Sequence, residues 1–327
     1  MTCAEKEMEE GPEVLEKTEE KRELVKKRCQ DLEFDQVILT GCGSSFNVSL
    51  VVAAEMRSSD IDALAVEASE ILFSGSYVDN NTLLIGFSQS GETSETARVI
   101  EESSEKGAET LAIVNREKST ISEISDTVVK TPAGEEDAAL ATKSVDSALL
   151  TGLLVRDSLS ERETSFKVEE SFQVSIEDAL EVLENSKEAY VLGIGSYRGI
   201  AAEAATKLGE VPLIHATHMT TLEFSHGPKS HAEDVPVVIL AMQPELEEVY
   251  RESIAEFTDA GARTLVVSPE GLDYSDEADV NIETSGKLFS TLKIIQRLSI
   301  QTALRKGCDP DNPPNLSKHV ERPEIEG

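Results

Sequence analysis

Short apolar runs alternate with longer amphipathic stretches along most of the chain. Residues 37–40, 82–87 and 110–114 form such runs, and stretches of helical length follow the first two. Apolar runs bounded by turn residues are typical of buried strands, and their alternation with helices indicates a parallel sheet covered on both faces. Shorter runs at 63–66 and 127–130 are interpreted as further strands. We therefore predict an α/β fold.

The second half of the chain repeats this arrangement. Gly41-Cys42-Gly43-Ser44 and Gly193-Ile194-Gly195-Ser196 each follow an apolar run and open a helix, and Gly107-Ala108 recurs as Gly261-Ala262 at a predicted helix end. The recurrence indicates two tandem subdomains, each a parallel sheet flanked by helices. The predicted segments are an N-terminal helical arm (1–34), a first subdomain (35–160), a linker and helix (161–185), a second subdomain (186–305) and a C-terminal tail (306–327).

The turn after the run at 82–87 has the composition of a phosphate-binding site. It opens a helix, and the N–H groups of a first helical turn favour an anion. Ser88, Ser90 and Thr93 add hydroxyl donors, and Gly91 lets the backbone come close to a ligand. An ordinary capped helix after a β-turn is the alternative interpretation.

Nucleotide-binding interpretations fit less well. No Gly-Lys-Ser/Thr follows the turn, as a nucleotide P-loop requires, and Phe46 replaces the third glycine of a dinucleotide fingerprint. The corresponding stretch of the second half, residues 241–245, has neither the hydroxyls nor the glycine, and Glu245 would repel an anion. We expect phosphate in the first half only, and no cofactor.

Composition adds constraints on location and partners. The chain has 327 residues, enough for two cores, and 63 acidic against 30 basic side chains give a net charge of −33. Such a field repels nucleic acid and acidic membranes, and a heavily solvated surface suited to high salt is the simplest interpretation of it. Without an apolar span or a signal region, and with four scattered cysteines, we expect a cytoplasmic protein.

Histidines concentrate in one stretch of the second half. His215 and His218 lack the further ligands and spacing of a zinc site, so we expect no metal. His226 precedes Gly-Pro, which places its ring on a loop, where it could move protons near neutral pH. A loop histidine without a role is the alternative.

Four further charged residues are candidates for carbonyl chemistry. Glu203 and Lys207 have the spacing of a helix-surface ion pair, and Glu210 follows just past the predicted helix end. A glutamate beside the strand ends could move a proton between adjacent carbons of an open-chain sugar. Lys318, in the tail, would normally be solvated, but a desolvated lysine could attack a carbonyl or hold a ring oxygen.

Together these motifs resemble the sugar isomerase (SIS) domain family, most of all the isomerase half of glucosamine-6-phosphate synthase. The resemblance extends over nearly the whole chain. Its motifs, in family order, are residues 9–14, 41–47, 88–93, 141–143, 203–210, 226–228 and 315–318. Departures are modest: Gly209 replaces a usual lysine, residues 137–140 are atypical, and the tail continues to Gly327.

The resemblance implies a role for each site residue. Glu210 matches the base that moves a proton between C1 and C2, and Lys318 matches the tail lysine that engages the carbonyl carbon. His226 matches a ring-opening histidine that reaches a neighbouring subunit's site, which implies a homodimer. Glu203 and Lys207 match supporting residues. The residues that match the phosphate and hydroxyl ligands are Ser44, Ser45, Ser88, Gln89, Ser90 and Thr93.

The expected activity follows from what the chain shares with the synthase and what it does not. No nucleophilic cysteine follows Met1, so we expect no glutaminase domain. We therefore expect an amino-sugar-phosphate isomerase, first of all a deaminase that converts glucosamine 6-phosphate to fructose 6-phosphate and ammonia. Synthesis from free ammonia and cleavage of fructosamine-type phosphates are alternatives. A non-catalytic sugar-phosphate sensor is another, but it would not need Glu210, His226 and Lys318 together.

Overall fold

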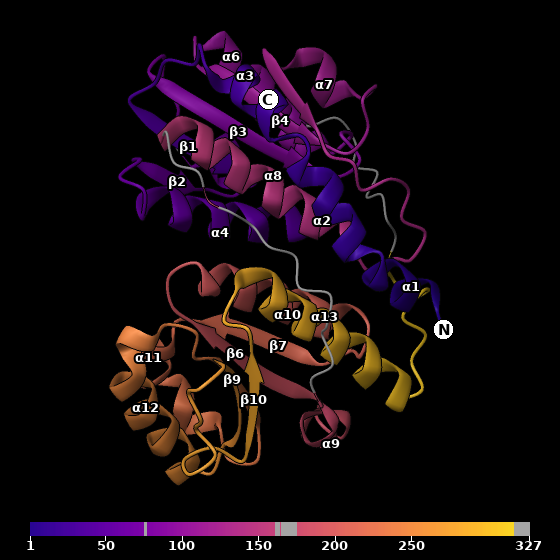
Figure 1. Ribbon diagram of the computed structural model, residues 1–327, viewed down its shortest axis with the longest axis vertical. Coiled ribbons are helices and arrows are strands. Elements are labelled where there is room, and N and C mark those ends of the chain that lie inside the picture. The colour runs from indigo at the N-terminus through magenta and orange to yellow at the C-terminus, as the bar shows by residue number, and fades with distance from the viewer. Residues whose placement is uncertain (75–76, 161–163, 165–174, 317–327) are drawn as a thin grey trace. The chain divides into compact units, whose positions relative to one another are not determined.

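Two α/β units, each built on a five-stranded parallel sheet, form the computed structural model (Figure 1). It describes residues 1–74, 77–160, 164 and 175–316. The N-terminal unit contains Glu9–Glu136 and the segment from Ala141 through helix α8 (Lys143–Ser160). The C-terminal unit contains residues 175–316, together with Met1–Met8 and Asp137–Leu140. The predicted fold class is confirmed.

The sheet of the N-terminal unit has the order β2-β1-β3-β4-β5. All neighbours are parallel, so the carboxyl ends of the strands share one edge. Every residue of β3 is buried, as expected of a central strand with helices on both faces. The strands are β1 (Gln36–Thr40), β2 (Ala63–Ala65), β3 (Thr82–Ser88), β4 (Glu109–Val114) and β5 (Thr127–Lys130).

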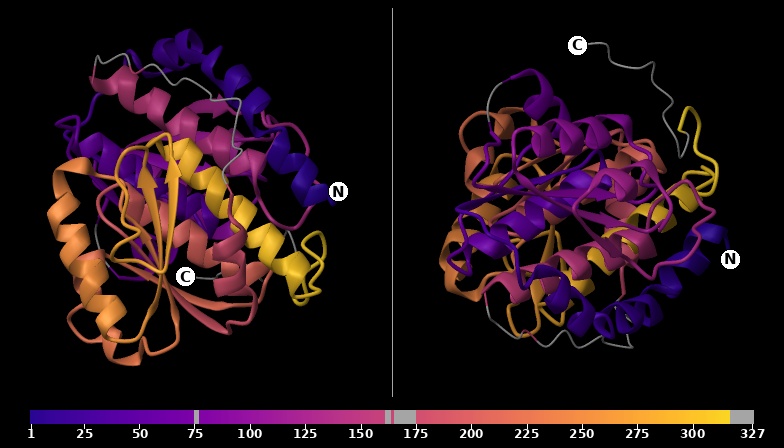
Figure 2. Two further views of the ribbon diagram at one scale, coloured as in Figure 1. Left: turned by 60° about the horizontal axis from the view of Figure 1, so that its bottom comes forward. Right: turned by 90° about the horizontal axis from the view of Figure 1, so that it is seen from above.

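Helices cover both faces of this sheet (Figures 1 and 2). On one face Ile38, Leu84 and Ala112 of the strands pack with Val99 and Ile121 of the helices in one apolar cluster. On the other face α8 packs against the N-terminal helices. The helices of this unit that follow β1 are α4 (Ser44–Arg57), α5 (Ala68–Phe73), α6 (Ser94–Glu105), α7 (Thr120–Ile124) and α8.

The C-terminal unit repeats the topology of the first. Its sheet has the order β10-β9-β8-β6-β7, which is the first order read from the opposite edge. Its strands are β6 (Glu188–Gly193), β7 (His215–Met219), β8 (Pro236–Leu240), β9 (Arg263–Pro269) and β10 (Val280–Thr284). Its helices are α9 (Glu177–Glu184), α10 (Tyr197–Glu210), α11 (Thr221–Phe224), η1 (Pro228–His231), η2 (Pro244–Leu246), α12 (Glu247–Asp259) and α13 (Leu288–Arg305).

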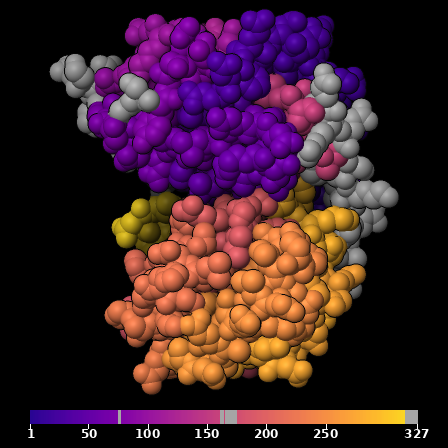
Figure 3. All heavy atoms as spheres, turned by 90° about the vertical axis from the view of Figure 1, so that its left-hand side faces the viewer, coloured from indigo at the N-terminus to yellow at the C-terminus, as the bar shows by residue number. Residues whose placement is uncertain are grey.

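Aromatic packing fixes one face of the C-terminal unit. Phe224 of α11 meets Phe257 of α12 edge to face, with ring centroids 4.8 Å apart. Tyr250 and Tyr274 are buried in the same cluster. Edge-to-face pairs add to the free energy gained by burying the rings. Figure 3 shows the face of this unit that α11 and α12 cover.

The predicted duplication also appears at two helix ends. Gly107 and Gly261 both have φ +85°, a conformation that suits glycine. The N–H of Ala108 donates to Ser103 O, and the N–H of Ala262 donates to Phe257 O, each at 3.1 Å. These bonds are the same C-terminal capping motif in both units.

The N-terminal arm of the described structure is built from three short helices. They are α1 (Cys3–Glu9), α2 (Gly11–Glu19) and α3 (Arg22–Cys29). Pro12 lies in the first turn of α2, where its missing N–H costs no helical hydrogen bond. A proline inside a continuous helix would remove such a bond, so α1 ends before it. The buried Val14 and Leu15 lie on α2, and Thr18 Oγ1 lies 2.7 Å from Ser147 Oγ of α8. Among the helices of the described residues, none is long and apolar enough to cross a membrane.

Candidate functional site

A pocket lies at the carboxyl ends of β1, β3, β4 and β5 in the N-terminal unit. It is partly open to solvent. In parallel α/β sheets, ligands bind beyond this edge of the strands. Its polar lining consists of Ser44, Ser45, Ser88, Gln89, Asn115, Thr131 and Ser144, and its apolar lining of Val48, Ile113, Val114, Ala141, Val145 and Ala148.

The turn from Ser88 to Thr93 is built by its own hydrogen bonds. Ser88 Oγ accepts the N–H of Gly91 at 3.0 Å and lies 3.1 Å from Thr93 Oγ1. Ser90 Oγ accepts the N–H of Glu92 at 3.1 Å. Thr93 is the residue before α6, yet its side chain makes no capping hydrogen bond to that helix within the described part of the chain. The first turn of α6 therefore keeps the donor character that an anion site needs.

Gly91 is required at this turn for two reasons. Its φ is +70°, which side chains with a Cβ rarely adopt. A Cβ would also lie 2.1 Å from Ser119 Oγ, so the turn packs directly on the segment that begins α7. The N–H of Ile121 donates to Gly91 O at 3.0 Å and fixes that contact.

The structure separates the predicted phosphate ligands into two groups. Ser44 and Ser45, in the first turn of α4, line the pocket together with Ser88 and Gln89. Ser90 and Thr93 belong to the hydrogen-bonded turn and are not among the lining residues.

Three polar residues of the pocket were not expected from the sequence. Asn115 follows β4, Thr131 follows β5, and Ser144 begins α8. Thr131 Oγ1 donates to Asn115 Oδ1 at 3.0 Å, and Asn115 Nδ2 donates to Gly134 O at 2.7 Å. The sequence held a signal for the first two, because each is the polar residue that directly follows a predicted strand.

In the C-terminal unit a glutamine occupies the equivalent turn. Gln243 Nε2 donates to Ile194 O at 2.8 Å, and its Oε1 accepts the hydroxyl of Tyr250. Gln243 also lies beside Gly195, 3.4 Å from where a Cβ would be. The side chain of Gln243 is therefore engaged with its own unit at the position where the first unit has hydroxyls.

Helix α10 presents the three charged candidates of the C-terminal unit. Lys207 Nζ lies 2.6 Å from Glu203 Oε1, and both side chains are buried. The expectation of a helix-surface pair is wrong, because the helix is covered where these residues lie. Two charges removed from water must compensate each other closely, so breaking this pair would leave a costly buried charge.

Glu210 is half-buried at the last position of α10. Burial raises its pKa to about 7, the positive charge of Lys207 opposes that rise, and the negative charge of Glu203 adds to it. A carboxyl with a pKa near neutrality is present in both protonation states under physiological conditions. It can therefore accept and return a proton, as a general base must.

His226 lies in the turn between α11 and η1 and is exposed. The turn is held by α12, since Ser225 Oγ donates to Glu256 Oε2 at 2.8 Å and Lys229 forms an ion pair with the same carboxylate. The bonds from Lys229 and Ser225 lower the pKa of Glu256, and the charge of His226 adds to this effect. The imidazole is thus presented to solvent on a fixed turn.

The remaining candidate residues are the two histidines of the zinc hypothesis and the tail lysine. His215 and His218 lie on β7, and the described residues contain no group of three His, Cys, Asp or Glu side chains that could hold a metal ion. His218 is half-buried, and its burial lowers its pKa, with the charge of Arg198 adding to the shift. Lys318 lies outside the described residues.

A comparison with known families matches residues 33–156 to the SIS domain. The chain contains a SIS domain over these residues. It is 31% identical over 306 residues to a glutamine–fructose-6-phosphate aminotransferase (isomerizing) of Pyrobaculum aerophilum, covering 87% of this chain and 51% of that protein. The SIS-domain protein thus spans about half the length of such relatives.

Solved structures share the fold of the chain. The C-terminal domain of a glucosamine–fructose-6-phosphate aminotransferase from Francisella tularensis superposes with a TM-score of 0.81 at 22% identity, covering 96% of this chain and 98% of that one. A glucosamine-6-phosphate deaminase from Thermotoga maritima superposes with a TM-score of 0.75 at 25% identity, covering 94% of this chain and 99% of that one. The first comparison establishes the fold, and the second adds a relative of matching length.

Proposed function

We propose that this SIS-domain protein is an aldose–ketose isomerase of amino-sugar phosphates. Its proposed reaction converts glucosamine 6-phosphate and water to fructose 6-phosphate and ammonia. The observation that carries the proposal is Glu210, a half-buried carboxyl whose pKa is raised to about 7 beside the Glu203–Lys207 pair. A carboxyl in this state suits proton transfer between two carbons of a sugar.

The phosphate end of the substrate is assigned to the pocket of the N-terminal unit. The hydroxyls of Ser44, Ser45 and Ser88 and the amide of Gln89 provide neutral donors there, and Ser90 and Thr93 hold the turn. Among the described residues, none that lines the pocket is a lysine or an arginine. Neutral donors and a helix N-terminus can bind the phosphate group of the substrate and still allow the product to be released.

The reacting end of the substrate is assigned to Glu210, His226 and Lys318. In the open-chain aldose, the Glu210 carboxylate would take the proton from C2 and return it to C1. The amino-bearing C2 is then oxidised to the imine level while C1 is reduced, and addition of water to C2 expels ammonia. His226, from a second copy in a homodimer, would open the ring, and Lys318 would engage the carbonyl carbon.

Two other activities would use the same site. The aminotransferase of Pyrobaculum aerophilum forms an amino-sugar phosphate by name, so synthesis from fructose 6-phosphate and free ammonia is the second candidate. Cleavage of fructosamine-type phosphates would use the same proton transfer. A sugar-phosphate sensor would have no use for a carboxyl poised near neutrality, so the state of Glu210 favours an enzyme.

Ammonia release tests the proposal directly. The purified protein is incubated with glucosamine 6-phosphate at low and at high salt, and ammonia and fructose 6-phosphate are measured. Glu210→Gln should lower the rate by about 10²- to 10⁴-fold. Glu252→Gln changes an exposed glutamate of α12 and should leave the rate unchanged.

A substrate panel separates the alternatives. Absence of both ammonia and ketose with glucosamine 6-phosphate would refute the deaminase assignment. Turnover of fructose 6-phosphate with free ammonia, or of a fructosamine phosphate, would then identify the reaction. Thermal stabilisation by a sugar phosphate with no turnover of any of them would indicate a sensor.

A further inference from the structure

One hydroxyl of the pocket is bound by a carboxylate. Ser144, the second residue of α8, lines the pocket, and its Oγ donates to Glu136 Oε2 at 2.5 Å. A hydrogen bond from a hydroxyl to a carboxylate is stronger than one between two neutral groups. Both residues belong to the N-terminal unit.

Glu136 is fixed by the start of the same helix. Its Oε1 accepts the N–H of Thr142 at 2.7 Å and the Thr142 hydroxyl at 3.0 Å. The side chain is only 8% exposed. A buried carboxylate with these bonds at a helix N-terminus is stabilised by the first-turn N–H groups, and it has no freedom to swing away from Ser144.

The carboxylate decides which way the Ser144 hydroxyl bonds. An ionised carboxylate only accepts, so the single hydroxyl proton of Ser144 is directed to Glu136. The oxygen of Ser144 keeps lone pairs that can accept a bond from a ligand. It cannot also donate to a phosphate oxygen, and the negative charge of Glu136 behind it would repel one. Ser144 therefore differs chemically from Ser44, Ser45 and Ser88 in the same pocket.

We propose that Ser144, held by Glu136, accepts a hydrogen bond from a hydroxyl group of the bound phosphosugar and does not bind its phosphate group. The inference rests on the proposed phosphosugar function of this pocket. Ser144 would be a specificity-determining residue that distinguishes a polyhydroxylated phosphate ester from inorganic phosphate. Glu136 would be a positioning residue that acts through it.

The test compares two ligands in matched variants. Affinities for fructose 6-phosphate and for inorganic phosphate are measured by calorimetry on the full chain at high salt. Ser144→Ala should weaken fructose 6-phosphate binding by about 3- to 10-fold, the worth of one hydrogen bond, and leave phosphate binding unchanged. Ser158→Ala is the control, because Ser158 lies on the same helix, is not among the residues that line the pocket, and donates its hydroxyl to the carbonyl of Leu154.

Glu136→Gln tests the positioning role. The amide introduced at position 136 can donate to the Ser144 oxygen, so the Ser144 hydroxyl is no longer directed to residue 136. The affinity for fructose 6-phosphate should therefore fall again, while the affinity for inorganic phosphate stays unchanged. Glu136→Gln added to Ser144→Ala should cost no further affinity, whereas a merely structural role would add its own loss. Retained phosphate binding shows in each variant that the pocket is folded.

The outcomes separate this inference from the proposed function. If Ser144→Ala binds fructose 6-phosphate as tightly as the wild type, or loses inorganic phosphate instead, the assignment of Ser144 is wrong while the phosphosugar site stands. If the wild type binds inorganic phosphate but no phosphosugar, both the proposed function and this inference are refuted.

Discussion

The carboxylate of Asp311 accepts the backbone N–H of Ala4 at 2.8 Å, across 307 positions of the chain. The same carboxylate accepts the N–H of Cys3 at 2.8 Å, and Asp311 O accepts the N–H of Ala139. Asp311 thus satisfies the free donors of α1 and joins three segments of the C-terminal unit that are far apart in sequence. The apolar cluster beside it contains Val211, which directly follows Glu210.

We expect Asp311→Ala to lower the free energy of unfolding by about 1 kcal/mol, because two N–H groups of α1 lose their acceptor. Urea unfolding followed by circular dichroism measures the change. Asp311→Asn keeps a good capping side chain and should lose less. The exposed Asp276 of the same unit supplies the control, Asp276→Ala, and an equal effect of both alanine variants would show that the cap contributes nothing.

Activity should depend on pH through Glu210. The carboxyl is protonated below its pKa of about 7, so the base form and the rate should rise as the pH passes upward through that value. The pH profile of kcat/KM for glucosamine 6-phosphate measures this acidic limb.

Substitutions of the two charged neighbours of Glu210 test the direction in which the acidic limb of the pH profile moves. Glu203→Gln removes a negative charge that raises the pKa of Glu210, so the limb should move to lower pH. Lys207→Met removes a positive charge that lowers it and should have the opposite effect. If the limb stays in place in Glu203→Gln, a group other than Glu210 governs it. Each of the two variants breaks the buried pair, so circular dichroism of both must show that the fold is kept before their pH profiles are compared.

Two glycines with the same backbone conformation test the phosphate-binding turn. Gly91 has φ +70° and no room for a Cβ, whereas Gly134 has φ +72° and nothing within 4 Å of the Cβ position. Gly134→Ala should cost only the backbone strain, about 1 kcal/mol. Gly91→Ala should cost clearly more and also weaken phosphate binding, since Ser119 must move. Thermal unfolding with and without phosphate provides both measurements, and similar losses in the two variants would contradict the packing argument.

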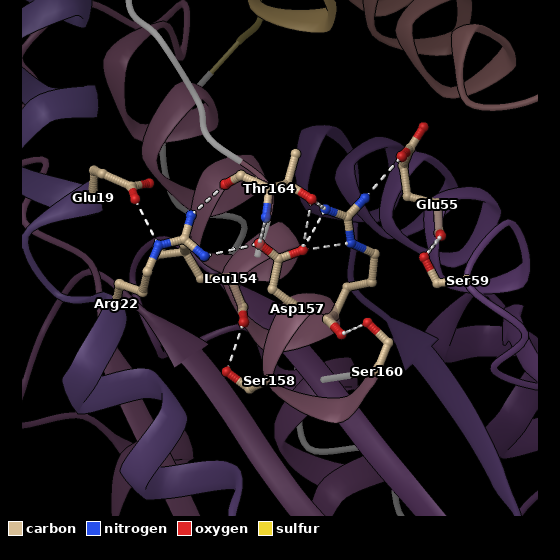
Figure 4. A network of polar contacts seen from close by, with 10 residues as sticks. Glu19, Arg22, Glu55, Ser59, Leu154, Asp157, Ser158, Ser160 and Thr164 are labelled. Carbon is tan, nitrogen blue, oxygen red and sulfur yellow. Dashed lines mark hydrogen bonds and ion pairs between the residues drawn. The ribbon is translucent and has the colours of Figure 1, made fainter. Parts of the chain in front are cut away.

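A buried ion network lies at the end of α8 (Figure 4). Asp157, 3% exposed, accepts Arg22 Nη1 at 2.9 Å and Arg156 Nε at 3.0 Å, and Arg156 Nη1 reaches Glu55 at 3.0 Å. Thr164 donates its N–H to Asp157 at 3.0 Å. The network ties α3 and α4 to α8. Burial opposes ionisation of Asp157, but the bonds from Arg22, Thr164 and Arg156 outweigh it and lower its pKa below the usual value.

We expect Asp157→Asn to lower the free energy of unfolding at neutral pH by about 3 kcal/mol, because two arginines lose their shared partner. A lowered pKa contributes stability above the unfolded-state pKa, and that contribution is lost as the pH falls through the folded-state pKa. The difference from wild type should therefore shrink in urea titrations repeated below about pH 4. A difference that does not change with pH would show that packing, not charge, holds this site.

The sequence by itself determined the parallel α/β halves and the turn at Ser88 to Thr93. These features are encoded locally, because buried central strands need continuous apolar runs and a tight turn needs glycine at a fixed position. Strands β7 and β10 are among the elements that escaped prediction. Strand β7 carries His215 and His218 and lies at the edge of its sheet, and β10 is short and partly polar.

Only the tertiary structure decided which polar residues share a site. Glu136 and Ser144 are separated by an irregular segment, and no local sequence pattern indicates that the Ser144 hydroxyl donates to the Glu136 carboxylate. The Glu203–Lys207 spacing is the same for a surface pair and for a buried one, so its burial and the raised pKa of Glu210 depend on what packs over α10. Sequence patterns specify which elements form, but desolvation depends on residues brought together from distant positions.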